Sequence, residues 1–298
     1  NLKNKDKYHF IEEDIVNQIA VLDILNKYKP RAIFNFAAES HVDNSIECPD
    51  AFIKTNINGT FNLLKSTHAY WKKLSENEKN LFRFVHISTD EVFGSLSLSE
   101  KAFTEESKYL PNSPYSASKA SSDHLVRCFH QTYSMPIIIT NCSNNYGPHQ
   151  HDEKLVPKVI KNVMNLDEIP IYGSGKQIRD WLYVEDHVDA LLTVFKKGRI
   201  GETYNIGGNN ERNNIEVVQN ICSTLDNLVP NNSKNISKYS DLISFVEDRQ
   251  GHDFRYAINA SKIKNDLQWS PKENFESGMK KTIQWYLDNN YQDDYKKF

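Results

Sequence analysis

The chain has 298 residues, of which 39% are hydrophobic, 25% charged and 11% aromatic. This composition is typical of a globular protein, and the length suits one large domain or two smaller ones. A net charge of -3 argues against a general nucleic-acid-binding protein, and a mean hydropathy of -0.64 without a long apolar run predicts no membrane-spanning helix.

In the first half of the chain, short apolar runs typical of buried strands alternate with segments in which apolar residues recur every three or four positions, as in helices. In chain order, the expected elements are an extended segment at 8–11, a helix at 14–28, a strand at 31–38, a helix at 51–70, a strand at 83–88, a helix at 115–133 and a strand at 136–141. This alternation predicts an α/β fold with a doubly wound, mostly parallel sheet of the Rossmann type.

The pattern changes after about residue 145. A helix is expected at 155–166, then short elements between glycine-containing loops, a weakly patterned polar segment at 227–241 and a last helix at 275–287. We therefore expect a Rossmann-type domain over residues 1–145, to which later segments return, and a smaller mixed α/β lobe over residues 146–298.

The four cysteines form no C-x-x-C pair, and no Cys/His cluster has the spacing of a zinc site. We expect reduced thiols in a cytoplasmic protein that holds no metal.

Tyr115 and Lys119 are four residues apart in the predicted helix 115–133, so they share one face of it. A lysine cation beside a phenol lowers the phenol's pKa, and the phenolate can then take a proton from a substrate hydroxyl. The spacing alone is weak evidence. Its position in the first turn of a helix, after a strand that ends in polar residues, favours a function.

Those polar residues include Thr89, Asp90 and Glu91, at the carboxyl end of the predicted strand 83–88. In an open parallel sheet, ligands bind beyond such ends. Adjacent carboxylates in different surroundings acquire different pKa values, so that one can serve as an acid and the other as a base. The residues are equally compatible with a helix cap or a solvated loop.

Three other features have two interpretations each. The small residues of 36–40 allow a cofactor to approach the backbone, or they are a tightly packed strand end. Asp14 and Ile15 could contact an adenine, or Asp14 could cap the following helix. Arg179 and Arg249 could together clamp a diphosphate, although each alone suits an ion pair.

Three motifs together, namely residues 88–94, Tyr115 with Lys119, and residues 141–147, resemble those of the extended short-chain dehydrogenase/reductase superfamily. Within it, the chain is similar to the dTDP-glucose 4,6-dehydratases, because sugar epimerases and decarboxylases usually lack the Asp90–Glu91 pair. The resemblance extends from about residue 8 to residue 288. It implies an NAD-dependent hydro-lyase that converts dTDP-glucose to dTDP-4-keto-6-deoxyglucose and water.

The resemblance also implies individual roles. Tyr115 would take the proton of the 4-hydroxyl, Glu91 the C5 proton, and Asp90 would protonate the departing 6-hydroxyl, with Thr89 and Lys119 also catalytic. The residues implied to line the NAD site are Asp14, Ile15, Phe36, Ala37, Ala38, Glu39, Ser40, Thr55, Tyr115, Lys119 and Asn145. Those implied to bind the sugar nucleotide are Ser40, Thr89, Asn144, Lys154, Leu155, Pro170, Ile171, Tyr172, Arg179, Asn214, Asp248, Arg249, Gln250, Gly251 and His252.

The sequence departs from the family at its beginning. The family opens with a strand and a glycine-rich turn that holds the cofactor's pyrophosphate, whereas the first glycine here is Gly59. The resemblance therefore leads us to expect that roughly 40 residues of a βαβ opening unit are missing, and that this chain binds NAD poorly.

Two alternatives stay open. The chain could be a related sugar-nucleotide enzyme, such as a UDP-sugar 4,6-dehydratase or an epimerase, or a non-catalytic sugar-nucleotide-binding remnant. For the main interpretation, the family implies a homodimer that serves nucleotide-sugar metabolism, most often rhamnose biosynthesis, and binds neither nucleic acid nor a membrane.

Overall fold

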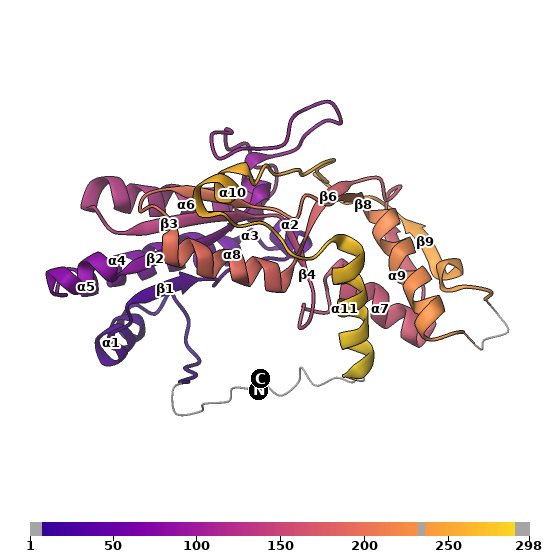
Figure 1. The fold of residues 1–298 in the computed structure, drawn as a ribbon, viewed down its shortest axis with the longest axis horizontal. Coiled ribbons are helices and arrows are strands. Elements are labelled where there is room, and N and C mark those ends of the chain that lie inside the picture. The colour runs from indigo at the N-terminus through magenta and orange to yellow at the C-terminus, as the bar shows by residue number, and fades with distance from the viewer. Residues whose placement is uncertain (1–7, 232–235, 290–298) are drawn as a thin grey trace. The chain divides into compact units, whose positions relative to one another are not determined.

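The structure is a computed structural model of the chain, and it describes residues 8–231 and 236–289 (Figure 1). The chain divides into two compact units. Unit 1 comprises Asn1–His86 and Ser113–Ile139, and unit 2 comprises Ile87–Asn112 and Thr140–Phe298. The chain therefore passes from unit 1 to unit 2 and returns before it leaves again.

A four-stranded sheet has the order β1-β2-β3-β7. Its strands are β1 (Ala32–Asn35), β2 (Arg83–Thr89), β3 (Ile137–Cys142) and β7 (Thr203–Ile206). β1 and β2 are parallel, and Asn35 lies opposite His86. The predicted α/β fold of the Rossmann type is confirmed, and strands 83–88 and 136–141 are each found to within one residue at either end.

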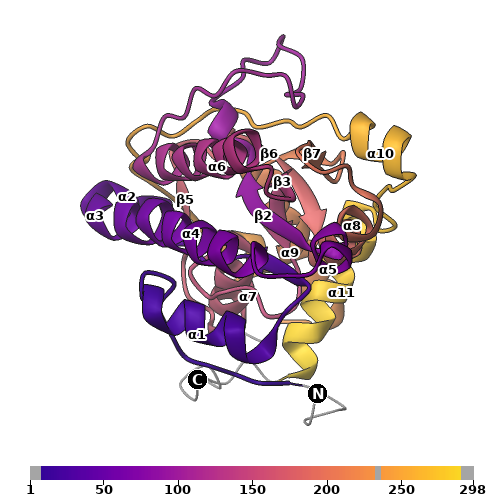
Figure 2. The same cartoon turned by 90° about the vertical axis from the view of Figure 1, so that its left-hand side faces the viewer.

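The helices of unit 1 follow from local signals. They are α1 (Gln18–Tyr28), α2 (Val42–Glu47), α3 (Pro49–Phe52), α4 (Thr60–Trp71), α5 (Glu76–Leu81) and α6 (Pro114–Tyr133), with a π-helical segment at Ile53–Gly59. α6 begins with a capping box of Ser113 and Ser116 and with Pro114 in its first turn. α4 and α6 lie side by side (Figure 2) and bury residues such as Leu64 and Val126 with Phe84 of β2.

Four expectations for unit 1 are wrong in detail. The strand expected at 31–38 ends at Asn35. Residues 8–11 form no strand. The first helix begins at Gln18 rather than residue 14, because Asn17 caps it. The Asp14 carboxylate instead accepts a hydrogen bond from the backbone N–H of Val16 at 3.0 Å. The single helix expected at 51–70 is divided into α3, the π-helical segment and α4, and buried Asn56 lies in the widened turn.

Unit 2 contains two further sheets, of order β4-β6-β8 and β5-β9. Their strands are β4 (Asn144–Tyr146), β5 (Ile169–Tyr172), β6 (Ile178–Tyr183), β8 (Glu211–Asn213) and β9 (Ile243–Val246). The helices are α7 (Leu155–Asn165), α8 (Val184–Lys197), α9 (Asn214–Leu228), α10 (Ser261–Leu267) and α11 (Phe275–Asp288), with 3₁₀ turns at Asp90–Phe93 and Tyr239–Leu242. The expected helices 155–166 and 275–287 are confirmed to within one residue.

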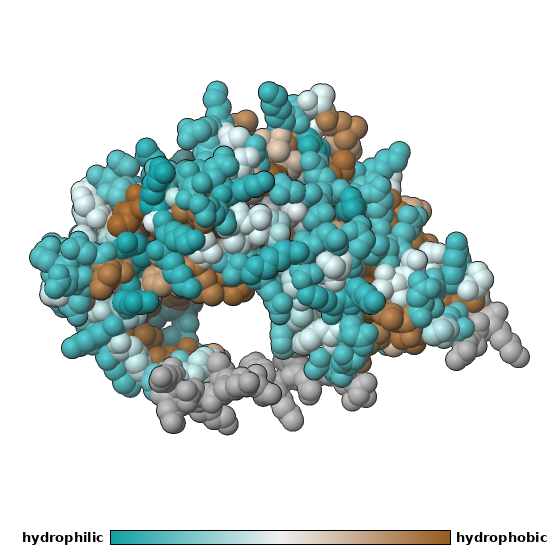
Figure 3. All heavy atoms as spheres, viewed as in Figure 1, coloured by the Kyte–Doolittle hydropathy of each residue, from teal (hydrophilic) through white to brown (hydrophobic). Residues whose placement is uncertain are grey.

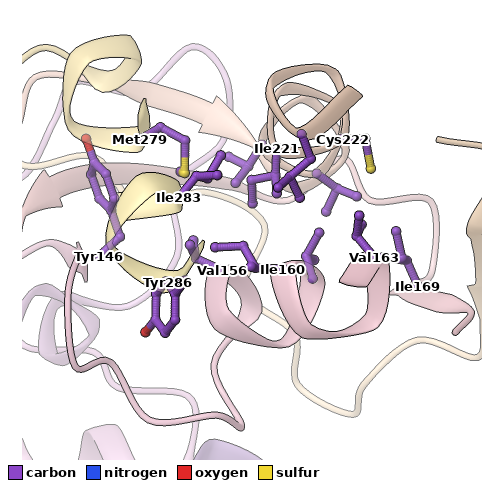
Figure 4. Packing of buried hydrophobic residues seen from close by; sticks show 14 of the residues in the cluster. Tyr146, Val156, Ile160, Val163, Ile169, Ile221, Cys222, Met279, Ile283 and Tyr286 are labelled. Carbon is purple, nitrogen blue, oxygen red and sulfur yellow. The ribbon is translucent and has the colours of Figure 1, made fainter. Parts of the chain in front are cut away.

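The core of unit 2 lies among α7, α9 and α11. Ile160, Ile221 and Ile283, one from each helix, are fully buried, and side chains from the three helices point toward one another (Figure 4). The polar segment expected at 227–241 begins as the end of α9, and its residues 232–235 lie outside the described residues.

Hydrophilic side chains predominate on the face of the molecule seen in Figure 3. Within residues 8–231 and 236–289, none of the helices has both the length and the hydropathy needed to cross a membrane.

Candidate active site

In unit 1, Tyr115 and Lys119 lie in the first two turns of α6, on one face of the helix. Both are nearly enclosed, with 9% and 4% of their surfaces exposed. The ring of Phe52 meets the Tyr115 ring edge-on, with 6.3 Å between the centroids. A lysine held at such a position brings a cation next to the phenol in surroundings that contain little water, where its electrostatic effect is strong.

A hydrogen-bond chain fixes the turn that carries Tyr115. The Asn56 side chain accepts from the backbone N–H of Glu39 at 2.8 Å and donates to the Glu39 carbonyl at 3.0 Å and to Ser118 Oγ at 2.8 Å. Ser118 Oγ in turn donates to the Tyr115 carbonyl at 2.7 Å. The loop after β1 is thus joined to the first turn of α6. Sequence reasoning did not predict Asn56 as a site residue, because its burial is visible only in the structure.

The residues predicted to line the cofactor site in unit 1 include exposed apolar side chains and an ordered backbone segment. Phe36, directly after β1, has 59% of its surface exposed and is followed by Ala37 and Ala38. Ile15 packs so closely on Gly59 that a Cβ there would lie 2.7 Å from it. Asn62 Nδ2 also donates to the Ile15 carbonyl at 2.6 Å. Glu39 and Ser40 are exposed and Thr55 is half-buried, so the side chains of Glu39 and Ser40 are accessible to a ligand.

In unit 2, Thr89, Asp90 and Glu91 form the start of a 3₁₀ turn at the end of β2. Thr89 Oγ1 accepts from the backbone N–H of Glu91 at 3.3 Å, and Asn141 Nδ2 donates to the Thr89 carbonyl at 3.0 Å. The cap considered for this segment is therefore present, and Thr89 provides it. The carboxylates of Asp90 and Glu91 do not provide this cap.

Asp90 and Glu91 differ in their surroundings. Burial, and then the negative charges of Glu91 and Asp180, hold the pKa of Asp90 well above its ordinary value. Burial also raises the pKa of Glu91, but the cations of Arg179 and Lys154 oppose the rise. Asp90 Oδ2 is buried and has no hydrogen-bond partner among the residues that the structure describes. Asp90 is therefore suited to carry a proton, and Glu91 to be the ionised member of the pair.

Arg179 is a buried cation rather than a surface residue. Its guanidinium donates to the carbonyls of Ile178 at 2.8 Å and Asp253 at 2.9 Å, and it lies 4.2 Å from the centre of the Tyr256 ring. The Tyr256 hydroxyl donates to Asp253 Oδ2 at 2.5 Å. These contacts fix the guanidinium within electrostatic reach of both Asp90 and Glu91.

The loop predicted to hold the diphosphate is organised around Asp248. Its carboxylate oxygens lie 2.9 Å from Gln177 Nε2 and 2.7 Å from His252 Nδ1. The Arg249 guanidinium lies 5.1 Å from the centre of the Tyr172 ring at the end of β5. The charges of Lys154 and Arg249 act on the Glu91 carboxyl together with that of Arg179. Three cations of unit 2 therefore lie within electrostatic range of one carboxylate.

The other predicted substrate residues of unit 2 have varied placements. Asn144 and Asn214 begin β4 and α9. Leu155 begins α7 and packs on the core. The Ile171 side chain, 2% exposed, belongs to the core, and its backbone is paired with Phe245 of β9. Pro170 is half-buried, and Gln250 and Gly251 are exposed.

Asn145 of unit 2, predicted at the cofactor, is held by His187, whose Nδ1 lies 2.9 Å from Asn145 Oδ1. Burial lowers the pKa of His187 to about 4, so the ring is neutral near pH 7 and donates this hydrogen bond through Nδ1–H. Sequence reasoning missed His187, which lies in α8, a helix that the sequence analysis did not predict.

Residues 1–282 match the family described as GDP-mannose 4,6 dehydratase. A dTDP-glucose 4,6-dehydratase of Neisseria meningitidis serogroup B is 54% identical over 283 residues, which cover 95% of this chain and 80% of the relative. The enzyme of the same name from Haemophilus influenzae is 54% identical over 288 residues, covering 97% and 85%.

Solved structures agree. The dTDP-glucose 4,6-dehydratase of Bacillus anthracis in complex with NAD superposes with a TM-score of 0.83 at 41% identity, covering 98% of this chain and 83% of that one. The Streptomyces venezuelae enzyme, also with NAD bound, has a TM-score of 0.86 at 37% identity, covering 97% and 83%. The chain therefore belongs to the GDP-mannose 4,6 dehydratase family of nucleotide-sugar enzymes, where it is similar to the dTDP-glucose 4,6-dehydratases.

Proposed function

We propose that the protein removes water from dTDP-glucose and forms dTDP-4-keto-6-deoxyglucose. The observation that carries the proposal is the adjacent pair Asp90 and Glu91, in which a buried carboxyl suited to hold a proton stands beside one surrounded by cations. An elimination needs one acid and one base, and this pair supplies both. The names of the relatives at 54% identity support the same reaction.

The proposal includes NAD as the cofactor, which when bound takes a hydride from C4 of the sugar and returns it to C6. Lys119, Tyr115 and the segments around Ile15, Phe36 and Thr55 would hold it in unit 1, together with Asn145 of unit 2. The domain division at residue 145, into a cofactor part and a substrate part, belongs to this proposal as well.

The protein's own groups move the protons. Tyr115, as phenolate, takes the proton of the 4-hydroxyl as C4 becomes a carbonyl. The carbonyl makes the C5 proton acidic, and Glu91 removes it while Asp90 gives its proton to the departing 6-hydroxyl, which leaves as water. Glu91 then returns its proton to C5. Over one cycle the proton gained by Tyr115 balances the proton lost by Asp90.

The nucleotide would be held by the cations of unit 2. Arg179 is already fixed by carbonyl oxygens, and Arg249 and Lys154, whose charges also act on Glu91, would contact the diphosphate. Thr89 and Ser40 would contact the hexose.

The test is incubation of the protein with NAD and either dTDP-glucose or UDP-glucose, followed by mass analysis of the products. We expect loss of one water from dTDP-glucose and a much slower reaction with UDP-glucose. An isomer of unchanged mass would indicate an epimerase, and no conversion of either sugar would contradict the proposal.

We also propose a homodimer formed through α4 and α6. Phe61 and Tyr133, on these helices, have 45% and 46% of their surfaces exposed, and both rings pack against Phe129. An exposed aromatic surface of this kind is typical of an interface. Light scattering should give twice the chain mass for the wild type and the chain mass for Phe61→Glu. A monomeric wild type would contradict the proposal.

The proposal places the protein in the cytoplasm, in nucleotide-sugar metabolism that leads to rhamnose. All four cysteines are free in the structure, which agrees with a reducing compartment.

A further inference from the structure

A chain of buried polar groups lies behind Tyr115 and Lys119 in unit 1. It consists of Asn35 on β1, His86 on β2 and Asp123 on α6, and none of the three has more than 2% of its surface exposed. Buried polar residues are costly unless they interact with one another, so such a chain in the interior calls for a physical explanation.

The backbone brings the chain together. Asn35 and His86 are opposite each other in the parallel pairing of β1 and β2, so their side chains are on the same face of the sheet. Tyr115, Lys119 and Asp123 follow one another at intervals of four residues on α6, and so they share one face of the helix.

The contacts define the state of the histidine ring. His86 Nδ1 lies 3.2 Å from Asn35 Nδ2, and His86 Nε2 lies 3.3 Å from Asp123 Oδ1. An amide nitrogen only donates, so Nδ1 accepts and the ring proton is on Nε2, the ring nitrogen that lies beside the carboxylate. Burial and the charge of Lys119 lower the pKa of His86, which keeps the ring neutral. The charged members of this group are then Lys119 and Asp123.

Helical side chains lean toward the N-terminus of their helix. Asp123 therefore leans toward the turn of Lys119, and Lys119 leans toward the turn of Tyr115. Both Lys119 and Asp123 act electrostatically on the His86 ring, so both charges lie near the same ring. A lysine that is 96% enclosed retains its proton only with a counter-charge nearby.

We infer that Asp123, oriented by His86 and Asn35, is the positioning residue that keeps the Lys119 ammonium charged and directed at Tyr115. Asp123 contacts neither substrate nor cofactor in this assignment. Its effect on turnover rests on the proposed function, whereas its effect on the Tyr115 phenol does not.

The test is the titration of Tyr115, measured in the full chain as the alkaline absorbance difference between a protein and its Tyr115→Phe counterpart. In Asp123→Asn, loss of the counter-charge releases or neutralises Lys119, and the midpoint should rise by about one pH unit or more. Turnover near pH 7 should fall about tenfold per unit, because less phenolate is present.

The sign of the shift decides the inference. If Asp123 were only an anion near the phenol, its removal would favour the phenolate and the midpoint would fall. A fall, or no change, would therefore overturn the inference. A wild-type midpoint at the ordinary value of a phenol would instead contradict the proposed role of Tyr115, so the two failures are distinguishable.

Ser122→Ala is the matched control. Ser122 is the neighbouring residue, it is fully buried, and its hydroxyl donates to the Lys119 carbonyl at 2.8 Å. Its loss changes the helix without changing a charge, and the midpoint should stay where it is. A rise as large as that of Asp123→Asn would show that the midpoint follows packing, which overturns the inference.

A second pair of variants covers the case in which Asp123→Asn does not fold. His86→Gln keeps an N–H close to the position of Nε2, whereas His86→Leu has a similar size and no donor. We expect the Tyr115 midpoint to rise in His86→Leu and to remain near the wild-type value in His86→Gln. Equal midpoints in the two variants would overturn the inference.

Discussion

Asp90 and Glu91 are neighbours in sequence, yet their surroundings assign them different tasks. Asp90 is buried beside other carboxylates, whereas Glu91 is half-buried beside Arg179 and Lys154. The surroundings of Asp90 favour its neutral form. Those of Glu91 raise its pKa as well, but the nearby positive charges oppose the rise. The assignment of acid and base therefore depends on the fold of unit 2, which positions Arg179 through backbone carbonyls.

Glu91→Gln removes the proposed base without changing the shape of the side chain. We expect the overall reaction to slow by about 100-fold to 10,000-fold, the usual contribution of a general base. Oxidation at C4 should continue in part, because Tyr115 is intact. The measurement is exchange of the C5 hydrogen with heavy water. Asp90→Asn is the control, because it should retain this exchange while losing elimination. Exchange in Glu91→Gln at the wild-type rate would contradict the assignment.

The raised pKa of Asp90 also predicts how stability depends on pH. The folded chain binds this proton more tightly than the unfolded chain, so the stabilisation is complete below the pKa of unfolded aspartate and is lost as the pH rises through the raised folded pKa. Asn does not titrate, so Asp90→Asn does not lose stability in this way as the pH rises. Its Tm should exceed that of the wild type at about pH 8, and the difference should shrink toward about pH 4.

The control for this prediction is Asp50→Asn on α3, an exposed position that makes the same change of charge. A Tm gain for Asp90→Asn that does not depend on pH would show that burial of the charge is not its cause.

At this scale, spacing and adjacency were enough to predict Tyr115, Lys119, Asp90 and Glu91 as a group of interest. Their roles came from the family resemblance. Asn56 and Asp123 escaped notice because a single polar residue in a helical pattern looks the same whether it faces solvent or the interior. Only the packing of α6 on the sheet distinguishes the two.

At the scale of elements, the 3₁₀ turn that presents the two carboxylates is closed by Gly94. Its φ of 90° and ψ of -157° belong to a region that only glycine occupies without strain. A Cβ at this position would clash with the Leu110 carbonyl oxygen, because the two atoms would be much closer than van der Waals contact allows. The Leu110 atom is part of the backbone, so it cannot move aside as the end of a flexible side chain could.

Gly94→Ala should therefore lower the free energy of unfolding by about 1–3 kcal/mol from backbone strain alone. Chemical denaturation measures this directly. The comparison is Gly251→Ala, where φ is 61° and the nearest atom to a new Cβ is 3.6 Å away, so the loss should be smaller. Equal losses would indicate that the turn is not closed by Gly94 in the manner described.

The long helices α1, α6, α7 and α11 and the strands β2 and β3 could be predicted from periodicity and caps, since those signals are local. The π-helical segment Ile53–Gly59 could not, because its apolar pattern continues that of an ordinary helix. The extra width accompanies the hydrogen bonds of Asn56 to the loop after β1, which are contacts between residues 17 positions apart. Such widened turns often occur at functional sites.

At the scale of the whole molecule, the alternation of strands and helices predicted the α/β class and the parallel sheet, and both are confirmed. The small sheets β4-β6-β8 and β5-β9 were not predicted individually. Their strands are three to six residues long and pair with distant segments, for instance Ile169 with Ile243. Short strands with polar neighbours give little periodicity on which to base a prediction.

The central claim is that the protein oxidises and reduces the same sugar within one turnover. The most direct measurement uses dTDP-glucose with deuterium at C4, incubated with the protein and NAD, and locates the label in the product by NMR. The account predicts a 4-keto-6-deoxy product that carries the deuterium at C6. A product without deuterium at C6, or recovery of an epimer with the label still at C4, would contradict it.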